Sequence, residues 1–331
     1  MADGIRNLRP DEFDTFMRFL DRSYGFARGV FERGFPHLYK PTPEMCASTF
    51  VMEQGGRIVS HVGLYPIQTR MHGVFWPIAG IGGVGTLPEE RGKGYMTQLL
   101  DYVIEVMREQ EYALSWLGGD RQRYTLFGWE QAGLTYDLTF SQRALDRAGV
   151  EPVEIKACRP EEAFPAVQKL QSRFACHALR PDLLNQLRKD SLWIWTAKEG
   201  YALARGQPWG SLSIVELVSA AAQEASIVRA ILDWTGRREV RWNISAWDEE
   251  RLVRLMPSVR GWRLGGWQMW RVVDLTRALT LARPVLRQRA AALRDFKLAI
   301  GMRERHQTQV ATLAVHDGSV QVIRDRHAEA Y

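Results

Sequence analysis

The stretch GVGTLPEERGKGYMTQLL, residues 83–100, decides how this chain folds. It starts in an apolar, β-branched run typical of a buried strand and passes through a turn with glycine at 92 and 94. Apolar side chains then recur at the spacing of one helix face, at Met96, Leu99, Leu100, Val103, Ile104 and Met107. The pattern predicts a strand, a tight turn and an amphipathic helix that ends near Gln110.

The turn itself favours an anionic ligand. The first residues of a helix leave backbone N–H groups unpaired and carry the positive end of the helix dipole. Gly92 and Gly94 lack a Cβ atom, so an anion can approach the main chain closely, and Arg91 and Lys93 add positive charge beside it. This combination predicts a site for a phosphate or pyrophosphate group.

Three phosphate-binding motifs compete for this stretch. A P-loop is excluded because Lys93 is followed by glycine and position 87 is a leucine. A dinucleotide fingerprint is formally met by glycines within 80–85, but Thr-Leu-Pro at 86–88 follows where a helix should begin. The third motif, R-G-x-G-x-[AGM], is met by RGKGYM at 91–96.

The sequence around the turn fits an antiparallel sheet. Residues 50–86 alternate or run in apolar and β-branched residues, with breaks at Gly55-Gly56 and near His72-Gly73. Three consecutive antiparallel strands are therefore predicted, the last reaching about Thr86. Further predictions are a helix over 13–20, a buried strand over 112–117, a polar, partly helical turn over 121–133 and an alternating strand over 134–140.

The pattern restarts near residue 149 and changes again after Val273. Between these points helices are predicted around 165–174 and 248–256 and a strand around 210–220, but no second R-G-x-G run is present. The last part has two helix-like runs and a hairpin around Asp317-Gly318. The predicted domains are 1–148, 149–273 and 274–331.

The composition is that of an ordinary globular protein. The 331 residues are 46% hydrophobic and 25% charged, which excludes a disordered or collagen-like chain. The net charge of +6 is mild and scattered, so no nucleic-acid partner is expected, and the least polar stretch, 74–87, is too short and glycine-rich to cross a membrane.

Cys46, Cys158 and Cys176 are far apart and the histidines form no H-x-x-x-H pair, so no disulfide framework and no metal site are expected. With no signal peptide visible, a cytoplasmic location is expected.

The run RGKGYM, after a strand ending in VGTLPEE, resembles motif A of the GNAT superfamily of N-acetyltransferases. The layout of the whole chain resembles the enhanced-intracellular-survival (Eis) type within it. The resemblance implies an α+β fold with tandem GNAT-like domains built on mixed, mostly antiparallel sheets. Residues 1–148 would be the catalytic domain, 149–273 a degenerate copy and 274–331 a short sterol-carrier-like domain. It also implies a homo-oligomer, a hexamer in the relatives.

The resemblance further implies a site for acetyl-CoA as co-substrate. The strand would offer main-chain groups to the pantetheine arm, and the turn and helix start would hold the pyrophosphate. The last two residues of the set would lie at the second edge of the cleft. These implied cofactor-binding residues are Val84, Gly85, Thr86, Arg91, Gly92, Lys93, Gly94, Tyr95, Met96, Thr97, Gly119 and Asp120.

Tyr124, in RYTLFGW, matches the family's Y-x-x-F-G-[YFW] tyrosine, which protonates the departing CoA thiolate. The implied activity is direct transfer of an acetyl group to a primary amine of an unidentified small-molecule or peptide acceptor. A phenol with a pKa of about 10 suits a thiolate leaving group. The general base that takes the proton from the amine stays open. The candidates are water, Glu53 and the C-terminal carboxylate of Tyr331, since in the Eis-like relatives the C-terminal carboxylate of the chain has this role.

Two alternatives stay open. The missing base and the short third domain are also compatible with a catalytically inactive acyl-CoA-binding or scaffold protein. The aromatic residues Tyr24, Phe26, Phe31 and Tyr39 are candidates for the wall of an acceptor pocket, but core packing explains such residues equally well.

Overall fold

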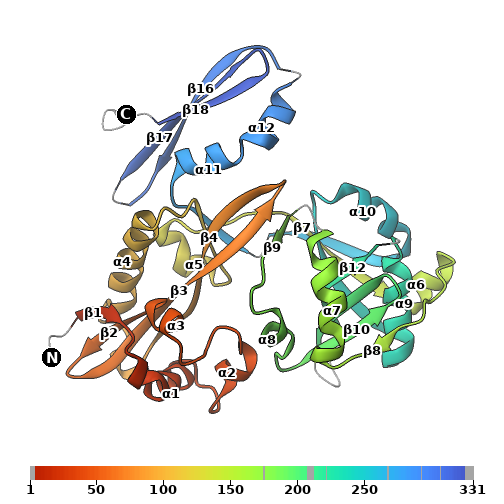
Figure 1. Ribbon diagram of the computed structural model, residues 1–331, viewed down its shortest axis with the longest axis horizontal. Helices are drawn as coiled ribbons and strands as arrows, with labels where there is room; N and C mark the ends of the chain where they lie inside the picture. Colours follow the sequence, from red (N-terminus) through yellow and green to blue (C-terminus); the bar gives the residue numbers. More distant parts are fainter. Residues whose placement is uncertain are drawn as a thin grey trace.

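The computed structural model describes residues 4–173, 176–206, 212–220, 222–266, 268–291, 293–305 and 307–324. Over these residues the chain forms three sheets. Figure 1 shows two sheet-and-helix bodies side by side, with a small sheet and its helices above the first body. Within the described part of the chain, no helix is long and apolar enough to cross a membrane.

The first sheet has the strand order β1-β2-β3-β4-β5-β15-β6, and β9 pairs with β3. Its strands are β1 (Gly4–Asn7), β2 (Thr49–Gln54), β3 (Arg57–Met71), β4 (Val74–Thr86), β5 (Leu114–Leu117), β6 (Glu130–Gln131), β9 (Cys176–Ala178) and β15 (Met269–Val272). The strands β2, β3 and β4 form an antiparallel meander, with turns at Gly55-Gly56 and His72-Gly73. The predicted three-stranded antiparallel unit is confirmed.

Helices cover both faces of this sheet because its strands alternate their side chains. Phe50 and Met52 of β2 pack in one core with α4 (Tyr95–Glu109), while Val51 between them packs in another core with α1 (Phe13–Tyr24). The predicted helices over 13–20 and from Tyr95 onward are confirmed. Shorter helices complete this part: η1 (Pro10–Glu12), α2 (Val30–Gly34), α3 (Pro43–Ala47), η2 (Pro88–Glu90), α5 (Arg121–Tyr124) and η3 (Thr125–Phe127).

The second sheet has the order β14-β7-β13-β12-β11-β10-β8. Its strands are β7 (Thr135–Ser141), β8 (Lys156–Ala157), β10 (Leu192–Ala197), β11 (Gly200–Gly206), β12 (Leu212–Ser219), β13 (Glu239–Ser245) and β14 (Val259–Gly265). Its helices are α6 (Gln142–Arg147), α7 (Pro160–Leu170), η4 (Gln171–Arg173), α8 (Leu183–Leu187), α9 (Glu224–Thr235), α10 (Glu249–Leu255) and η5 (Met256–Ser258).

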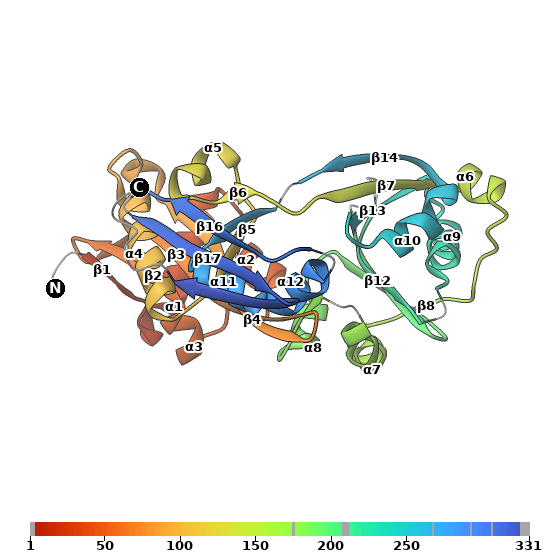
Figure 2. The same ribbon diagram turned by 90° about the horizontal axis from the view of Figure 1, so that it is seen from above.

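The two large sheets exchange strands. β7 follows the first sheet in the chain but pairs with β13 and β14 of the second. In return β15, near the end of the second part, pairs with β5 and β6 of the first. Figure 2 shows β7 and β14 running together into the second body. The strand predicted over 134–140 is present, and the predicted boundary near residue 149 follows both strand β7 and helix α6 in the chain.

The third sheet joins β16 (Phe296–Arg303), β17 (Thr308–His316) and β18 (Ser319–Arg324) as an antiparallel meander. The helices α11 (Leu275–Leu281) and α12 (Arg283–Ala290) precede it. The predicted hairpin at Asp317-Gly318 is confirmed, with φ of +47° and +70° at the two residues. The α+β class is confirmed as well, while the sterol-carrier likeness of this part stays a prediction.

Candidate active site

The site begins where β4 and β5 separate. The two parallel strands pair only between Ile78–Gly80 and Leu114–Trp116, whereas β4 continues to Thr86. A bulge in β4 opposite His61 and Gly63 bends the strand there, with Gly83 at a φ of +63°. The edge of β4 beyond Gly80 therefore lies outside the ladder with β5.

The turn after β4 leads directly into α4 and leaves the start of that helix open. Gly94 is its N-cap residue with a φ of +80°, and among the described residues no side chain caps it. A Cβ atom built on Gly92 or Gly94 would meet no atom of the described chain closer than 3.9 Å. In the described part of the chain, the start of α4 thus has no side-chain cap and open space beside its two glycines, which suits an anion.

The two cations of the turn are partly committed to protein partners. Arg91 donates from Nη2 to the carbonyl of Ser23, at 2.9 Å, which ties the turn to the end of α1. Lys93 Nζ lies 2.7 Å from the carboxylate of Glu90, and this ion pair raises the pKa of Lys93. The main-chain groups and the helix dipole are therefore the features of this turn that are most available to an anion.

Main-chain oxygens of β4 already have partners from neighbouring elements. The hydroxyl of Tyr24, at the end of α1, donates to the carbonyl of Val84 at 2.9 Å. Ser60 of β3 donates to the carbonyl of Gly85 at 3.0 Å. A Cβ atom on Gly85 would lie 2.5 Å from Oγ of Ser23, so glycine is needed for this close packing. Sequence reasoning did not find the contact of Tyr24, since the only local signal is its place at a helix end.

Tyr124 lies in the short helical turn after β5. Asp120 caps α5 by accepting from the N–H of Gln122 at 3.0 Å, and a Cβ atom on Gly119 would lie 2.4 Å from the Tyr124 ring. Gly119 and Asp120 therefore shape the turn that carries Tyr124. The ring is 6% exposed, and burial raises the pKa of its phenol, while the neighbouring guanidinium of Arg123 acts in the opposite direction.

Tyr24 and Tyr124 are electrostatic neighbours. Burial raises the pKa of Tyr24 most, and a charge on Tyr124 raises it further, while Arg123 lowers it. Because Tyr24 also holds the carbonyl of Val84, the Tyr124 phenol belongs to the same neighbourhood as the free edge of β4. Val84 of β4 and Tyr124 belong to one buried core cluster, and Tyr95 and Met96 at the start of α4 pack against it, so the chain brings these three elements together.

A row of aromatic rings extends from Tyr24 away from this edge. Tyr24 contacts Phe26 and Phe31 at centroid distances of 5.5 and 4.9 Å, and Phe31 contacts Tyr39 at 5.4 Å. Phe31 and Tyr39 are buried in the core under α1, whereas Tyr24 and Phe26 are 39% and 48% exposed. The row therefore contains two packing residues and two exposed residues, of which Tyr24 contacts β4 and Phe26 packs on Tyr24.

The candidate bases fare differently. Glu53 is 2% exposed and its carboxylate is engaged by Arg6 and, at 3.6 Å, by Arg9. Both guanidiniums reach the same oxygen, Oε2, of this buried side chain, so substrate has little access to it and Glu53 is a poor candidate for the base. Tyr331, the other residue considered, lies outside the described residues.

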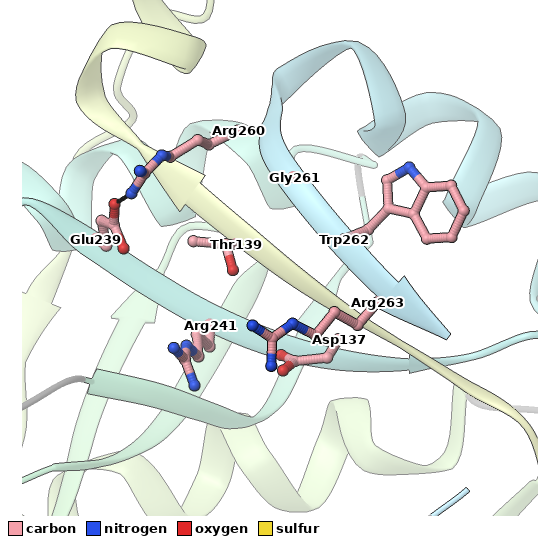
Figure 3. A pocket seen from close by; sticks show the side chains of 8 residues that line it. All are labelled: Asp137, Thr139, Glu239, Arg241, Arg260, Gly261, Trp262 and Arg263. Atoms are coloured by element: carbon pink, nitrogen blue, oxygen red, sulfur yellow. Dashed lines mark ion pairs between the residues drawn. The ribbon is translucent and has the colours of Figure 1, made fainter. Parts of the chain in front are cut away.

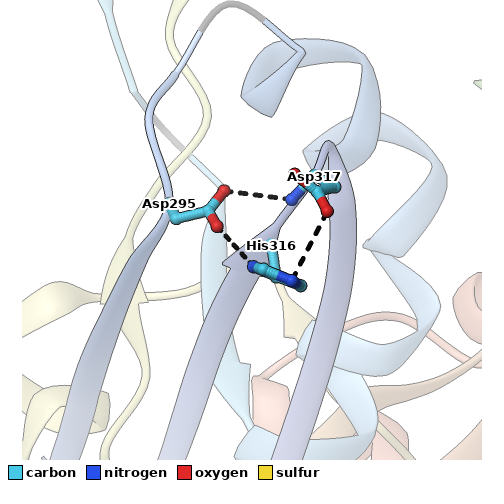
Figure 4. Close-up of side chains that lie close together, drawn as sticks. All are labelled: Asp295, His316 and Asp317. Atoms are coloured by element: carbon cyan, nitrogen blue, oxygen red, sulfur yellow. Dashed lines mark hydrogen bonds and ion pairs between the residues drawn. The ribbon is translucent and has the colours of Figure 1, made fainter.

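Two further features lie outside this neighbourhood. A hollow of about 300 Å³ on the second sheet is lined by charged residues of β7, β13 and β14, including the ion pair of Arg260 with Glu239 (Figure 3). Asp295, His316 and Asp317 cluster at the end of the third sheet, and all three are exposed (Figure 4). Neither contains a residue of the predicted cofactor site.

The splayed β4 and β5, the glycine turn and the tyrosine after β5 define an acyl-CoA-dependent acetyltransferase fold of the GNAT type. Residues 4–132 match the family model described as the acetyltransferase (GNAT) domain. This part of the chain is a GNAT acetyltransferase domain, and the predictions of the family and of an acyltransferase-class enzyme are confirmed for it. A search of curated protein sequences gave no match.

Solved structures extend the likeness of the fold over nearly the whole chain. A probable N-acyltransferase from Enterococcus faecalis V583 has a TM-score of 0.75 at 18% identity, over 99% of this chain and 86% of that one. A GCN5-related N-acetyltransferase from Kribbella flavida has a TM-score of 0.67 at 20% sequence identity, over 98% of this chain and 85% of that one. Eis1 from Mycobacterium abscessus has a TM-score of 0.67 at 17% sequence identity, over 98% of this chain and 85% of that one. The Eis-like layout predicted from the sequence is confirmed at the level of the fold.

Proposed function

We propose that the GNAT domain transfers an acetyl group from acetyl-CoA directly to a primary amine, with Tyr124 as the general acid. The observation that carries this proposal is the packing of three elements in one core cluster: the edge of β4 freed from β5, the uncapped start of α4, and the Tyr124 turn. Each has a distinct task in the reaction.

The start of α4 would hold the pyrophosphate. Gly92, Lys93 and Gly94 form the turn, and Tyr95, Met96 and Thr97 form the first turn of the helix, with its N–H groups open. Val84, Gly85 and Thr86 would guide the pantetheine arm along the β4 edge. Since Tyr24 holds the carbonyl of Val84, the arm either pairs with the remaining main-chain groups or displaces the Tyr24 hydroxyl.

Tyr124 would supply the proton for the sulfur. The neutral amine attacks the thioester carbonyl, the C–S bond breaks, and the phenol proton passes to the CoA thiolate. Burial raises the pKa of Tyr124, which keeps the phenol protonated at neutral pH. The attacking nitrogen becomes cationic and loses one proton to water, because Glu53 is held by Arg6, and the Tyr124 phenolate takes a proton back from water.

The solvent-facing rings of Tyr24 and Phe26 support an acceptor that is itself a cation. Aromatic faces attract ammonium groups, and the attraction grows as water is excluded. Tyr24 lies against the β4 edge and Phe26 packs on Tyr24, at 39% and 48% exposure, so an amine that approaches the thioester past Tyr24 would meet both rings. A homo-oligomer in a reducing cytoplasmic setting belongs to the same proposal, and the free thiols of Cys46, Cys158 and Cys176 fit it.

The second candidate is an acyl-CoA-binding protein without turnover. The bond of Tyr24 to the carbonyl of Val84 and the engagement of Glu53 favour it, because both occupy groups that a working site would use. Thiol release from acetyl-CoA, measured across polyamines, aminoglycosides and lysine peptides, separates the two. Tight CoA binding without release for any amine would favour the binding protein.

Replacing Tyr124 with phenylalanine tests the acid directly. The variant keeps the ring and its packing and loses only the proton donor, so kcat is expected to fall on the order of 10²–10⁴-fold. The Kd of acetyl-CoA, measured by calorimetry, is expected to stay within about twofold, since positioning of the cofactor is separate from acid catalysis. An unchanged kcat would remove Tyr124 from the mechanism, and no binding of acetyl-CoA at sub-millimolar concentration would remove the proposal itself.

A further inference from the structure

A buried arginine from a distant part of the chain reaches the turn that carries Tyr124. Arg271 lies on β15, opposite Ser115 of β5, and is 4% exposed. Its guanidinium donates to the carbonyl of Phe127 and lies 5.5 Å from the centroid of the Trp129 ring. Arg271 therefore contacts the second half of the turn that begins at Tyr124.

The turn is built to admit this guanidinium. Gly128 has a φ of +81°, which favours glycine, and a Cβ atom on it would lie 2.1 Å from Nη1 of Arg271, so a larger residue would push the guanidinium out of its present place. The N–H of Trp129 donates to the carbonyl of Tyr124 at 3.2 Å, and the two rings meet edge to face at 6.4 Å. A shift of Trp129 or of the Phe127 carbonyl would therefore move Tyr124.

The third sheet holds Arg271 in place through one carboxylate. Glu304, just after β16, has a side chain that is 7% exposed and forms ion pairs with both Arg271 and Arg108. Its other oxygen accepts from Nε2 of Gln309 at 2.8 Å, and the same amide nitrogen donates to the carbonyl of Val273 at 2.9 Å. Arg108 lies in the last turn of α4, so one acidic side chain links the third sheet to both α4 and the Tyr124 turn.

We propose that Arg271, oriented by Glu304, is a positioning residue for acetyl transfer. It fixes the turn over 124–129 so that the Tyr124 hydroxyl meets the departing sulfur, and it makes the third sheet part of the working enzyme. This inference rests on the proposed function, in which Tyr124 is the general acid. Because neither Arg271 nor Glu304 belongs to the candidate cofactor-binding set, their loss acts on kcat and leaves acetyl-CoA binding intact.

The chemistry of the contacts explains why an arginine is required. One guanidinium bonds a carbonyl and a carboxylate at once and stacks on an aromatic ring, which a single ammonium group cannot do. Glu304 is needed because two guanidiniums, those of Arg271 and Arg108, share its charge in a buried setting. Removing that charge leaves the buried Arg271 without its carboxylate partner, whereas Arg108 keeps its ion pair with Glu105, and breaking a buried pair costs far more than breaking an exposed one.

The test uses the full-length protein with Arg271→Lys and Glu304→Gln, each alone and combined with Tyr124→Phe. Thiol release from acetyl-CoA is measured with spermidine, kanamycin or a lysine-containing peptide, whichever is acetylated fastest. Each single variant is expected to lower kcat about tenfold to a hundredfold, as a displaced catalytic group does. The KM and Kd of acetyl-CoA are expected to stay within about twofold, and on the Tyr124→Phe background neither change should lower kcat further.

Arg277→Gln is the matched control. It breaks the 3.0 Å ion pair of Arg277 with Glu111, which also joins the third part of the chain to the end of α4 but does not reach the Tyr124 turn. Its kcat is expected to match the wild type. If Arg271→Lys melts far below the wild type, Glu304→Gln, which keeps the shape of the side chain, completes the same cycle.

The outcomes separate the two proposals. If Arg271→Lys and Glu304→Gln lower kcat by the same factor with Tyr124→Phe as without it, the positioning role is overturned and the acid role of Tyr124 stands. Unchanged kcat in both Arg271→Lys and Glu304→Gln, with Tyr124→Phe impaired, would do the same. If Tyr124→Phe itself turns over normally, the acid role fails first and the positioning role falls with it.

Discussion

At the scale of single residues, the site joins side chains that a motif identifies with others that it cannot. Tyr124 was identified because it lies within a short, local pattern, and the glycines at 92 and 94 because a tight turn needs them. Tyr24 was considered only as a pocket or core aromatic. Its bond to the carbonyl of Val84 depends on how α1 lies across the sheet, which no local spacing encodes.

Tyr24→Phe tests whether this hydroxyl competes with the cofactor. Losing one hydrogen bond is expected to lower the free energy of unfolding by about 1 kcal/mol. The carbonyl of Val84 becomes available to the pantetheine arm, so acetyl-CoA should bind up to about fivefold more tightly by calorimetry. Tyr39→Phe, in the same aromatic row, is the control and should leave the Kd unchanged. Weaker binding in Tyr24→Phe would mean that the hydroxyl assists the cofactor.

His61 makes the bulge in β4 sensitive to acid. It is fully buried behind the bulge, its Nδ1 lies 2.7 Å from the carbonyl of Gly83, and burial lowers its pKa to about 4. At a pH below about 6.5, the ordinary pKa of histidine, His61 binds a proton in the unfolded chain but stays neutral in the folded chain. Stability should therefore fall as the pH falls from about 6 to 4, by about 1.4 kcal/mol per pH unit for this residue.

His61→Asn should flatten that slope, because the amide can still donate to the carbonyl of Gly83 but does not titrate. Urea unfolding at several pH values measures the effect. A slope remains in the variant, since burial also lowers the pKa of His37, to about 3. His316→Asn is the control: Asp295 raises the pKa of His316, so its removal cannot flatten the acid slope. An unchanged slope in His61→Asn would contradict the assignment.

At the scale of elements, the sequence predicted what a local period can report. The 3.6-residue period of apolar residues predicts α4, and the breaks at Gly55-Gly56 and His72-Gly73 predict the hairpins of the first sheet. The separation of β4 from β5 was not predictable in this way, because it depends on where the ladder between two strands ends. That separation, at Gly80 and Trp116, is nevertheless what leaves the edge of β4 without a strand partner among the described residues in the candidate site.

Gly94→Leu tests the turn as an anion-binding element. A leucine side chain at the N-cap of α4 would fill the free space in front of the open N–H groups. Acetyl-CoA binding is expected to weaken at least about tenfold, since the pyrophosphate loses close main-chain contact. Calorimetry measures the Kd and thermal melting the stability.

Gly236→Leu is the matched control for Gly94→Leu. Gly236 also has a positive φ, of +64°, and its Cβ position is equally free of described neighbours. Both variants therefore carry a similar backbone strain of about 1–2 kcal/mol. Equal losses of stability with a loss of binding in Gly94→Leu alone would support the cradle, and equal binding in both would count against it.

At the scale of the whole molecule, the exchange of β7 and β15 joins the two large sheets into one folding unit. The sequence predicted these segments as strands or left them unassigned, and a strand pattern does not name its partner. Because β5 pairs with a strand more than a hundred residues later in the chain, the partner could only emerge from the fold. The same exchange brings Arg271 to the Tyr124 turn.

This exchange predicts how the chain responds to truncation. A fragment ending at residue 148 keeps β7 without β13 and β14, and β5 without β15, so two strand edges and the core positions of Met269 and Val273 are left open. Burial of two such side chains contributes roughly 3–6 kcal/mol, comparable to the whole stability of a domain. The fragment is therefore expected to aggregate or to melt without a cooperative transition, as followed by circular dichroism.

A fragment ending at residue 274 restores both exchanged strands and serves as the comparison. It keeps the pairing of β15 with β5 and the bond from the N–H of Val273 to the carbonyl of Ala113, at 2.9 Å, and should melt cooperatively. It lacks Glu304, so it should bind acetyl-CoA but turn over slowly. A well-folded fragment 1–148 would contradict the view that the sheets fold together, and wild-type kcat in fragment 1–274 would contradict the need for the third sheet.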